Sequence, residues 1–255
     1  VDYYDLSLED AISTIGAGVI LRQCAASGQY CDLIDRFGSG PNEGNPRLVD
    51  NSVRNVGGVE AAGVDFLVEY TGFETGLGEF GARLDGTYTD QYELEQADGT
   101  IVPHAGFFRD DLEGYFTEWR WTASLLFERG PFQASADLRY IGSATEFKSD
   151  FAGPCADSSG AVVIPAQFPG LSCVTDPNSY NFGQFRYEVD ERYYLDLQAS
   201  YEFEAGPTRN EVYLGIDNVT DRQPPLSFDA FNDNTDVRTF DTIGRYVYGG
   251  FRSRF

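Results

Sequence analysis

Hydrophobic and polar residues alternate along eight segments of this 255-residue chain. Between Trp119 and Phe127, for example, Trp, Trp, Ala, Leu and Phe occupy every second position, and Arg, Thr, Ser and Leu lie between them. Successive side chains of a β-strand point to opposite faces of a sheet, so this period of two predicts strands. The predicted strands are 1–8, 64–71, 80–88, 119–127, 132–140, 193–203, 212–216 and 247–255.

The two faces of these strands differ in charge. From residue 64 onward, none of the 33 positions on one face is charged, whereas 11 of the 27 positions on the other face are. A soluble β-sandwich also alternates, but its strands usually have only about five or six residues. Longer strands with an uncharged face favour a transmembrane β-barrel whose outer face meets lipid.

The connections between the strands alternate in length. Short turns are predicted at 75–78, 130–131 and 205–208, and long loops at 9–58, 96–113, 148–187 and 219–241. Outer-membrane barrels have short periplasmic turns and long extracellular loops. We therefore expect a cell outer membrane location, with the long loops outside and the C-terminus in the periplasm.

One short helix is predicted in the first long connection. Ile12, Ile15 and Val19 have helical spacing, and Ser7-x-x-Asp10 resembles a capping box. The segment from 24 to about 51 is rich in Gly, Pro and Asn, and it is predicted to be an irregular loop.

Composition narrows the function classes. A net charge of -23 argues against binding to nucleic acid, because such binding depends on Lys and Arg. No run of 18 apolar residues predicts a transmembrane helix. The chain contains no Met and begins in what already resembles a strand, so we expect it to be part of a longer protein. The four cysteines form two local pairs in predicted loops, and disulfides Cys24–Cys31 and Cys155–Cys173 are expected in an oxidising compartment.

Four stretches, spread from one end of the chain to the other, resemble the C-terminal barrel of TonB-dependent receptors. They are D-Y-Y-D-L-S-L-E-D-A-I (2–12), G-V-D-F-L-V-E-Y (63–70), V-Y-L-G-I-D-N-V-T-D-R-Q-P-P (212–225) and G-R-Y-V-Y-G-G-F-R-S-R-F (244–255). The resemblance implies a 22-stranded barrel with an N-terminal plug, which imports a scarce or bulky solute with energy from the TonB complex. Residues 1–255 would then be a single, partial barrel region containing roughly the last eight strands, without the plug.

The resemblance also assigns a role to the last strand. In the family, the C-terminal residues are a signal to the barrel-assembly machinery, and Phe255, Phe251 and Val247 match that signal. Ser253 and Gly249 stand where larger apolar residues are usual in the family. The other expected partners of the barrel are lipid and lipopolysaccharide.

Few residues are candidates for a binding site. Asp229, Asp233 and Asp236 could hold a structural Ca²⁺, although their loop lacks the Gly and the terminal Glu of an EF-hand, and a solvated loop is the alternative. We expect no other metal or cofactor. Four charged residues of the polar face could contact a solute in the lumen, although the interiors of large barrels are polar in any case. They are Arg83, Asp85, Asp137 and Arg139.

An enzyme is not expected. No G-x-S-x-G occurs, and a Ser-His-Asp arrangement would have to recruit His104, the only histidine, from a loop. The sequence therefore predicts the C-terminal part of a transport receptor. Two alternatives remain, namely a complete eight-stranded barrel with a structural or adhesive role and a membrane-embedded hydrolase that depends on His104.

Overall fold

The computed structural model describes residues 1–55, 57–96, 99–108, 114–148, 155, 170–176, 183–228, 230 and 234–255. The chain divides into two compact units. The larger unit comprises Val1–Tyr3, Gly63–Asp90 and Ala105–Phe255, and the smaller unit comprises Tyr4–Ala62 and Gln91–His104. No helix among the described residues has the length and apolar character that crossing a membrane requires.

Eight long strands form the principal sheet and confirm the eight predicted strands. Their order is β1-β6-β7-β11-β12-β16-β17-β18, so each long strand lies beside the one that precedes it in the chain. The short strand β8 (Ile101–Pro103) pairs with β7 off this path. The bounds are β1 Asp2–Glu9, β6 Gly58–Thr75, β7 Gly78–Glu95, β11 Trp119–Arg129, β12 Phe132–Ile141, β16 Arg192–Ala205, β17 Thr208–Asp217 and β18 Tyr246–Arg254.

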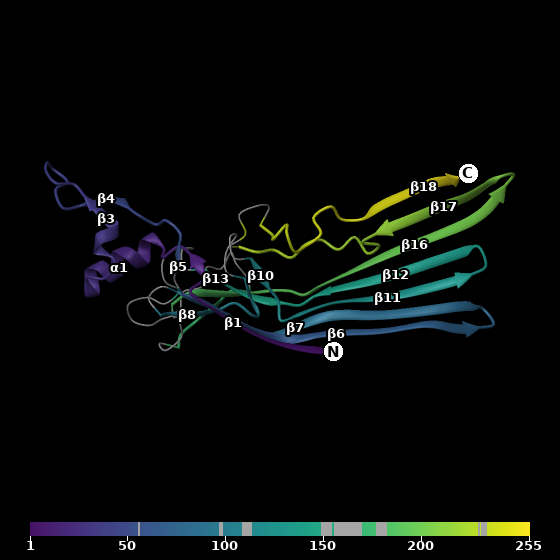
Figure 1. Ribbon diagram of the computed structural model, residues 1–255, viewed down its shortest axis with the longest axis horizontal. Coiled ribbons are helices and arrows are strands. Elements are labelled where there is room, and N and C mark those ends of the chain that lie inside the picture. Colours follow the sequence, from purple (N-terminus) through teal and green to yellow (C-terminus); the bar gives the residue numbers. More distant parts are fainter. Residues whose placement is uncertain are drawn as a thin grey trace. The chain divides into compact units, whose positions relative to one another are not determined.

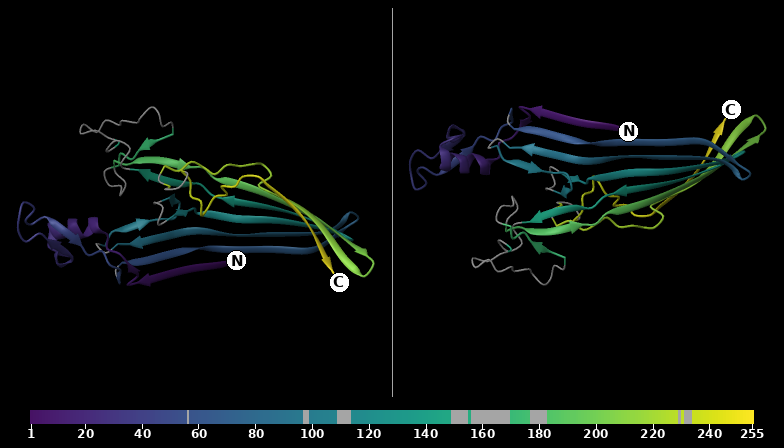
Figure 2. Two further views of the ribbon diagram at one scale, coloured as in Figure 1. Left: turned by 90° about the horizontal axis from the view of Figure 1, so that it is seen from above. Right: turned by 90° about the horizontal axis from the view of Figure 1, so that it is seen from below.

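Three tight turns join these strands in pairs, at the three predicted positions. In the first turn, Thr75 Oγ1 accepts hydrogen bonds from the N–H groups of Leu77 (3.1 Å) and Gly78 (3.3 Å). In the other two turns, Gly130 and Gly206 have φ of 57° and 62°, a left-handed conformation that glycine adopts without strain. Figure 1 shows all three turns at the same end of the strands. The two views in Figure 2 agree.

The strand register keeps the two predicted faces separate across the sheet. One row of directly opposed residues runs across six strands and contains no charge; it consists of Ala82, Leu125, Ala136, Leu197, Ile216 and Val247. The adjacent row on the other face consists of Arg83, Ser124, Asp137 and Asp196. A shift of one residue between any two strands would mix these rows, so the register preserves the charge pattern of the sequence.

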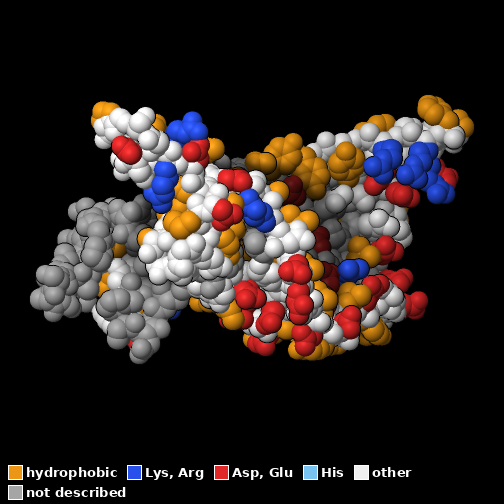
Figure 3. Space-filling model, turned by 60° about the vertical axis from the view of Figure 1, so that its left-hand side comes forward, with side chains coloured by type: hydrophobic (Ala, Val, Ile, Leu, Met, Phe, Trp, Pro, Cys, Tyr) orange, Lys and Arg blue, Asp and Glu red, His pale blue; other side chains and the backbone are white. Residues whose placement is uncertain are grey.

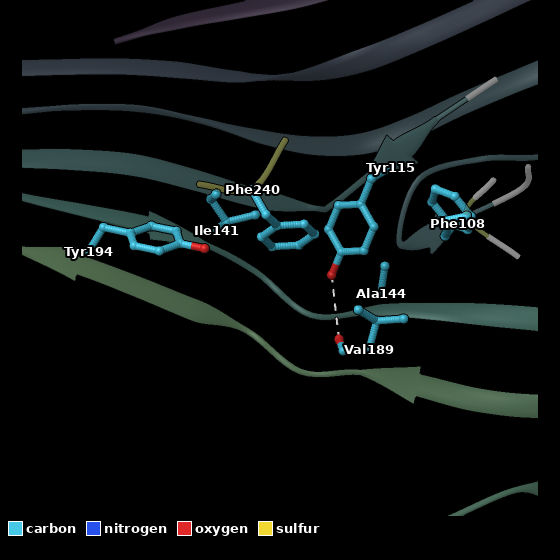
Figure 4. Close-up of a cluster of buried hydrophobic side chains, with 8 residues drawn as sticks. Phe108, Tyr115, Ile141, Ala144, Val189, Tyr194 and Phe240 are labelled. Atoms are coloured by element: carbon cyan, nitrogen blue, oxygen red, sulfur yellow. Dashed lines mark hydrogen bonds between the residues drawn. The ribbon is translucent and has the colours of Figure 1, made fainter. Parts of the chain in front are cut away.

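The sequence predicted long loops between the strands of the larger unit. In the structure these connections contribute to a second sheet. Its strands are β9 (Phe107–Phe108), β10 (Tyr115–Phe116), β13 (Ala144–Lys148), β14 (Ser172–Cys173) and β15 (Phe185–Val189), in the order β10-β9-β13-β15-β14. A buried apolar cluster joins this sheet to the principal one (Figure 4). The cluster contains Phe108, Tyr115, Ile141, Ala144, Val189, Tyr194, Ala230 and Phe240.

The smaller unit has a core of its own and corrects the predicted helix. Helix α1 spans Ala17–Ser27, not the segment from Ile12 to Val19, because Ile12 belongs to strand β2 (Ile12–Ser13), which pairs with β5 (Arg54–Asn55). The capping box does not form: the N-cap is Gly16, with φ 88° and no side-chain hydrogen bond.

Regular structure also continues through the segment from 24 to 51, which was predicted to be a loop. It contains the end of α1, a 3-10 helix η1 (Cys31–Leu33) and the hairpin of β3 (Ile34–Arg36) and β4 (Pro46–Val49). Apolar side chains from these elements form the core of the smaller unit: Ile15, Val19, Ile20, Leu33 and Ile34.

The last two strands fit together through tyrosines that lie over glycines, and this contact gives a prediction. A Cβ atom added to Gly215 would lie 2.2 Å from Cζ of Tyr248, which faces it across the strands. Gly215→Ala is therefore expected to lower the free energy of unfolding by about 1–3 kcal/mol in urea titrations of the refolded full-length protein. Gly81→Ala on β7 is the matched control, because its added Cβ would meet nothing closer than 3.5 Å, an ordinary van der Waals contact.

The double variant Gly215→Ala/Tyr248→Ser tests the cause of this effect. If the clash with the ring is the cause, the two substitutions together cost less than the sum of the single costs. Strictly additive costs would show that the ring does not limit the space at Gly215.

Candidate functional site

The polar face of the principal sheet carries a band of paired charges, which includes the four residues selected from the sequence. Arg83 on β7 donates from Nε to Oδ1 of Asp85 at 2.8 Å, and its Nη1 lies 3.7 Å from Oε2 of Glu69 on β6. All three side chains are about half exposed. Because water screens exposed pairs, this group contributes little stability and leaves hydrogen-bonding capacity for another molecule.

The second part of the band lies on β12 and β16. Arg139 donates from Nε to Oδ2 of Asp196 at 3.1 Å, and its guanidinium lies over the ring of Tyr194 at 5.2 Å from the centroid. Ser124 donates a hydrogen bond to the carboxylate of Asp137. Asp196 was not selected from the sequence, although its position in the alternation placed it on this face.

Two shallow hollows are lined in part by polar-face side chains. One has a volume of about 300 Å³ and is lined by Glu69, Arg83, Ser124, Ser135 and Asp137, among others. The second, of about 210 Å³, is lined by Gln133, Ser135, Gln198 and Ser200, among others. The first offers charged groups of both signs and the second offers uncharged amide and hydroxyl groups, which suit contact with a polar molecule or a polar protein surface.

The second sheet holds a buried carboxylate that the sequence did not single out. Glu146 on β13 is 1% exposed, and its Oε1 accepts a hydrogen bond from Oγ of Ser227 at 3.1 Å. Its Oε2 accepts from the N–H of Phe228 at 3.0 Å. These contacts span 81 and 82 residues in the sequence, so no local pattern could have revealed them.

A tyrosine fixes the neighbouring end of this sheet. The hydroxyl of Tyr115 donates to the carbonyl oxygen of Gly142 at 2.9 Å and lies 3.4 Å from that of Val189 (Figure 4). Burial raises the pKa of the Tyr115 phenol well above its ordinary value. In this position the hydroxyl acts as a hydrogen-bond donor to the backbone.

The proposed calcium ligands fall only in part within the described residues. Asp236 is buried, and its carboxylate accepts hydrogen bonds from the backbone N–H of Arg238 and from Nε of Arg238, each at 3.1 Å. It also accepts from Oγ1 of Thr239 at 2.7 Å. Asp229 and Asp233 lie outside the described residues. Within the described part of the chain, no three His, Cys, Asp or Glu side chains form a group that could hold a metal ion.

The four cysteines form disulfides, and the histidine is buried. Disulfides join Cys24 to Cys31 and Cys155 to Cys173, the two local pairs of the sequence. His104 is fully buried, with Nδ1 2.9 Å from the carbonyl oxygen of Val102 and its ring edge-on to Tyr92. His104 therefore lies in the packed interior and not on an exposed face.

The last strand presents its apolar side chains at the surface. Phe251 and Val247 are more than half exposed, and Phe255 is fully exposed. Phe251 lies opposite Val212 on β17, with its ring 6.5 Å from that of Phe203. Their role in barrel assembly stays a prediction of the family resemblance.

Comparison with known proteins identifies the fold. No protein-family model matches the chain, and no curated protein sequence matches it. Among solved structures, the fold is similar to that of the FrpB iron transporter from Neisseria meningitidis (F3-3 variant), with a TM-score of 0.50 and 14% identity. The match covers 98% of this chain but 28% of the transporter. The predicted fold class is thereby confirmed: an antiparallel all-β chain with the architecture of a β-barrel outer-membrane protein.

Proposed function

We propose that these 255 residues are one region of the barrel wall of an outer-membrane, TonB-dependent importer. In this proposal the plug and the preceding strands belong to the rest of the protein. The long connections and both disulfides face the outside, and the polar band that includes Arg83, Asp85, Asp137 and Arg139 faces the lumen. Lipid, lipopolysaccharide, the TonB complex and the barrel-assembly machinery are its proposed partners.

One observation carries the proposal, namely an uncharged face that stays exposed. Leu125 is 61% exposed and Phe251 62%, and Val68, Leu197 and Leu214 are exposed on the same face. Figure 3 shows hydrophobic side chains uncovered at the surface beside acidic ones. A continuous apolar face across many strands is costly in water, and lipid is the solvent that removes this cost.

Aromatic bands near the two ends of the strands support this placement. Toward the long connections, the ring of Trp121 stacks on Tyr140 at 5.1 Å, and Tyr140 lies 4.8 Å from Tyr193. Toward the tight turns, Phe127 lies 4.9 Å from Phe80 and 6.1 Å from Phe132. The two bands are about 20 Å apart along β11, since a strand rises roughly 3.3 Å per residue. Strands of known barrels tilt by about 35–45°, so this spacing corresponds to about 15 Å across the membrane, within an apolar band of about 25 Å that aromatic girdles border.

Uptake measurements test the function. A strain that lacks the full-length gene is compared with the complemented strain for accumulation of labelled iron chelates, cobalamin, oligosaccharides and peptides, with and without a protonophore. We expect accumulation of one of these classes to require both the gene and the proton gradient. A protein that resides in the outer membrane but supports no energy-dependent uptake would overturn the importer and favour a structural or adhesive barrel.

A further inference from the structure

The connection between β17 and β18 is folded, and a hydrogen bond joins its two ends. Its described residues, 218–228, 230 and 234–245, are called the terminal strap here. At the start of the strap, Asn218 is fully buried and donates its N–H to Oδ1 of Asp196 at 2.7 Å. At the base, Oδ1 of Asp221 accepts the N–H of Arg245 at 2.9 Å, so the two ends of the strap are joined. These bonds fix where the strap leaves the sheet.

The terminal strap lies on the polar side of the principal sheet. Phe240 and Ala230 of the strap belong to the same buried cluster as Tyr194 and Ile141. Tyr194 and Ile141 both occupy polar-face positions of their strands, beside Asp196 and Arg139. Figure 4 shows Phe240 beside Ile141, among the side chains of this cluster. A strap packed on polar-face side chains would lie on the lumen side of a closed barrel.

A single carboxylate binds the middle of the strap. Both oxygens of Glu146 accept hydrogen bonds from it, one from Oγ of Ser227 and one from the N–H of Phe228. Oγ of Ser227 also accepts the N–H of Ala230 at 3.2 Å. These donors offset part of the cost of burying the carboxylate, and the carboxylate in turn holds Ser227 and Phe228 of the strap.

A disulfide cross-links the sheet that carries Glu146. The Cys155–Cys173 disulfide packs against Leu171 and Phe185, which lies on β15 beside β13. The ring of Phe228 meets Tyr187 of this sheet edge-on at 4.7 Å. The strap is therefore held by non-covalent contacts to a cross-linked support, and release of the strap would leave the support intact.

We propose that the terminal strap narrows the outer mouth of the lumen and that Glu146 is the positioning residue that holds it there. This inference rests on the proposed function. The strap then limits the size of molecules that reach the polar band, and displacement of the strap is required for a bulky solute. Small polar solutes reach the polar band without that displacement.

Thiol labelling of the full-length protein in intact cells tests the strap. All four cysteines of these residues are in disulfides, so Arg120→Cys introduces a free thiol. Arg120 is exposed on the polar face, directly opposite Ile141, which belongs to the same buried cluster as Phe240 of the strap. With Glu146→Gln added, a maleimide that carries a long polyethylene glycol chain is expected to react about tenfold faster, as loss of one charge-assisted hydrogen bond allows. The rate with N-ethylmaleimide should not change.

The controls separate the strap from the proposed topology. Glu188→Gln makes the same chemical change on β15, where Glu188 contacts Arg186 and Thr145, and should leave both rates unchanged. Ser39→Cys, in the exposed connection between β3 and β4, should react with the bulky reagent in every background. Should Glu146→Gln fail to assemble, Ser227→Ala removes one of the same hydrogen bonds and should also raise the bulky rate.

Two results would overturn the proposal in different ways. Equal bulky rates with and without Glu146→Gln and Ser227→Ala, together with labelled Ser39→Cys, would reject the strap and leave the importer standing. A Ser39→Cys thiol that reacts only after cell lysis would reject the outward orientation, and with it both proposals.

Discussion

Leu125→Arg in the full-length protein is expected to prevent stable assembly in the outer membrane, whereas Leu126→Arg is expected to be tolerated. The two residues are neighbours on β11 and differ mainly in the face they occupy. Leu125 is 61% exposed on the uncharged face, opposite Ala82 and Ala136. Arginine on the lipid side near mid-bilayer costs about 2–4 kcal/mol. This cost is a large share of the free energy of unfolding of a typical domain, about 5–15 kcal/mol.

Leu126 is the matched control because its side chain is also exposed, at 42%, but on the polar face. It lies opposite Gly81 and Ser135, on the face that carries Glu69 and Asp137, where an arginine would find carboxylates. Leu197→Arg repeats the test on β16, since Leu197 lies in the same uncharged row as Leu125. The two variants together show whether the lipid-facing surface is confined to β11 or extends across the sheet to β16.

Fractionation and heat-modified electrophoretic mobility measure the outcome. We expect the folded form of Leu125→Arg and Leu197→Arg to be depleted in outer membranes, and that of Leu126→Arg to match the unmodified protein. If all three variants assemble equally, the uncharged face does not meet lipid. If Leu126→Arg alone fails, the two faces have been assigned in reverse.

The strands and tight turns could be predicted because local rules determine them. The period of two on β11 survives in the register, and Gly130 and Gly206 adopt the left-handed conformations that tight turns require. The helix was misplaced for a local reason as well. Ile12 and Ile15 have helical spacing, but Ile12 pairs with Asn55, 43 positions away, and the helix begins only after Gly16. The pairing of β2 with β5 therefore determined the structure at Ile12, and the helical spacing of the isoleucines did not.

The loop architecture could not be predicted because it depends on distant contacts. Glu146 resembles any charged residue at the end of a strand, and only its bonds to Ser227 and Phe228 reveal a role. The polar band was only half recovered for a similar reason. Arg83 and Asp85 lie two positions apart, whereas Arg139 meets Asp196 across 57 residues. Alternation can place a side chain on a face, but it does not choose that side chain's partner.

The motif D-N-V-T-D at 217–221 was recognised by resemblance, and the structure gives it a physical basis. Asn218 is fully buried with φ 49°, a left-handed conformation that asparagine tolerates better than most residues. Its Oδ1 accepts the N–H of Arg222 at 2.8 Å, and its Nδ2 donates to the carbonyl oxygen of Arg222 at 2.9 Å. One side chain thereby closes the turn with which the terminal strap begins.

Asn218→Ala is therefore expected to cause the second large loss of stability. It removes two hydrogen bonds to the backbone of Arg222, at about 0.5–1.5 kcal/mol each, and places alanine in a left-handed conformation at about 1–2 kcal/mol. Asn218→Gly separates the two causes, because glycine removes the same hydrogen bonds but adopts this conformation without strain. Urea titrations of the refolded full-length protein should rank the unmodified protein above Asn218→Gly, and Asn218→Ala last. Trypsin should cleave the strap of Asn218→Ala fastest. If the Gly and Ala variants are equally stable, backbone strain does not contribute to the loss. If the free energy of unfolding of Asn218→Gly equals that of the unmodified protein, the side-chain hydrogen bonds to Arg222 do not stabilise the turn.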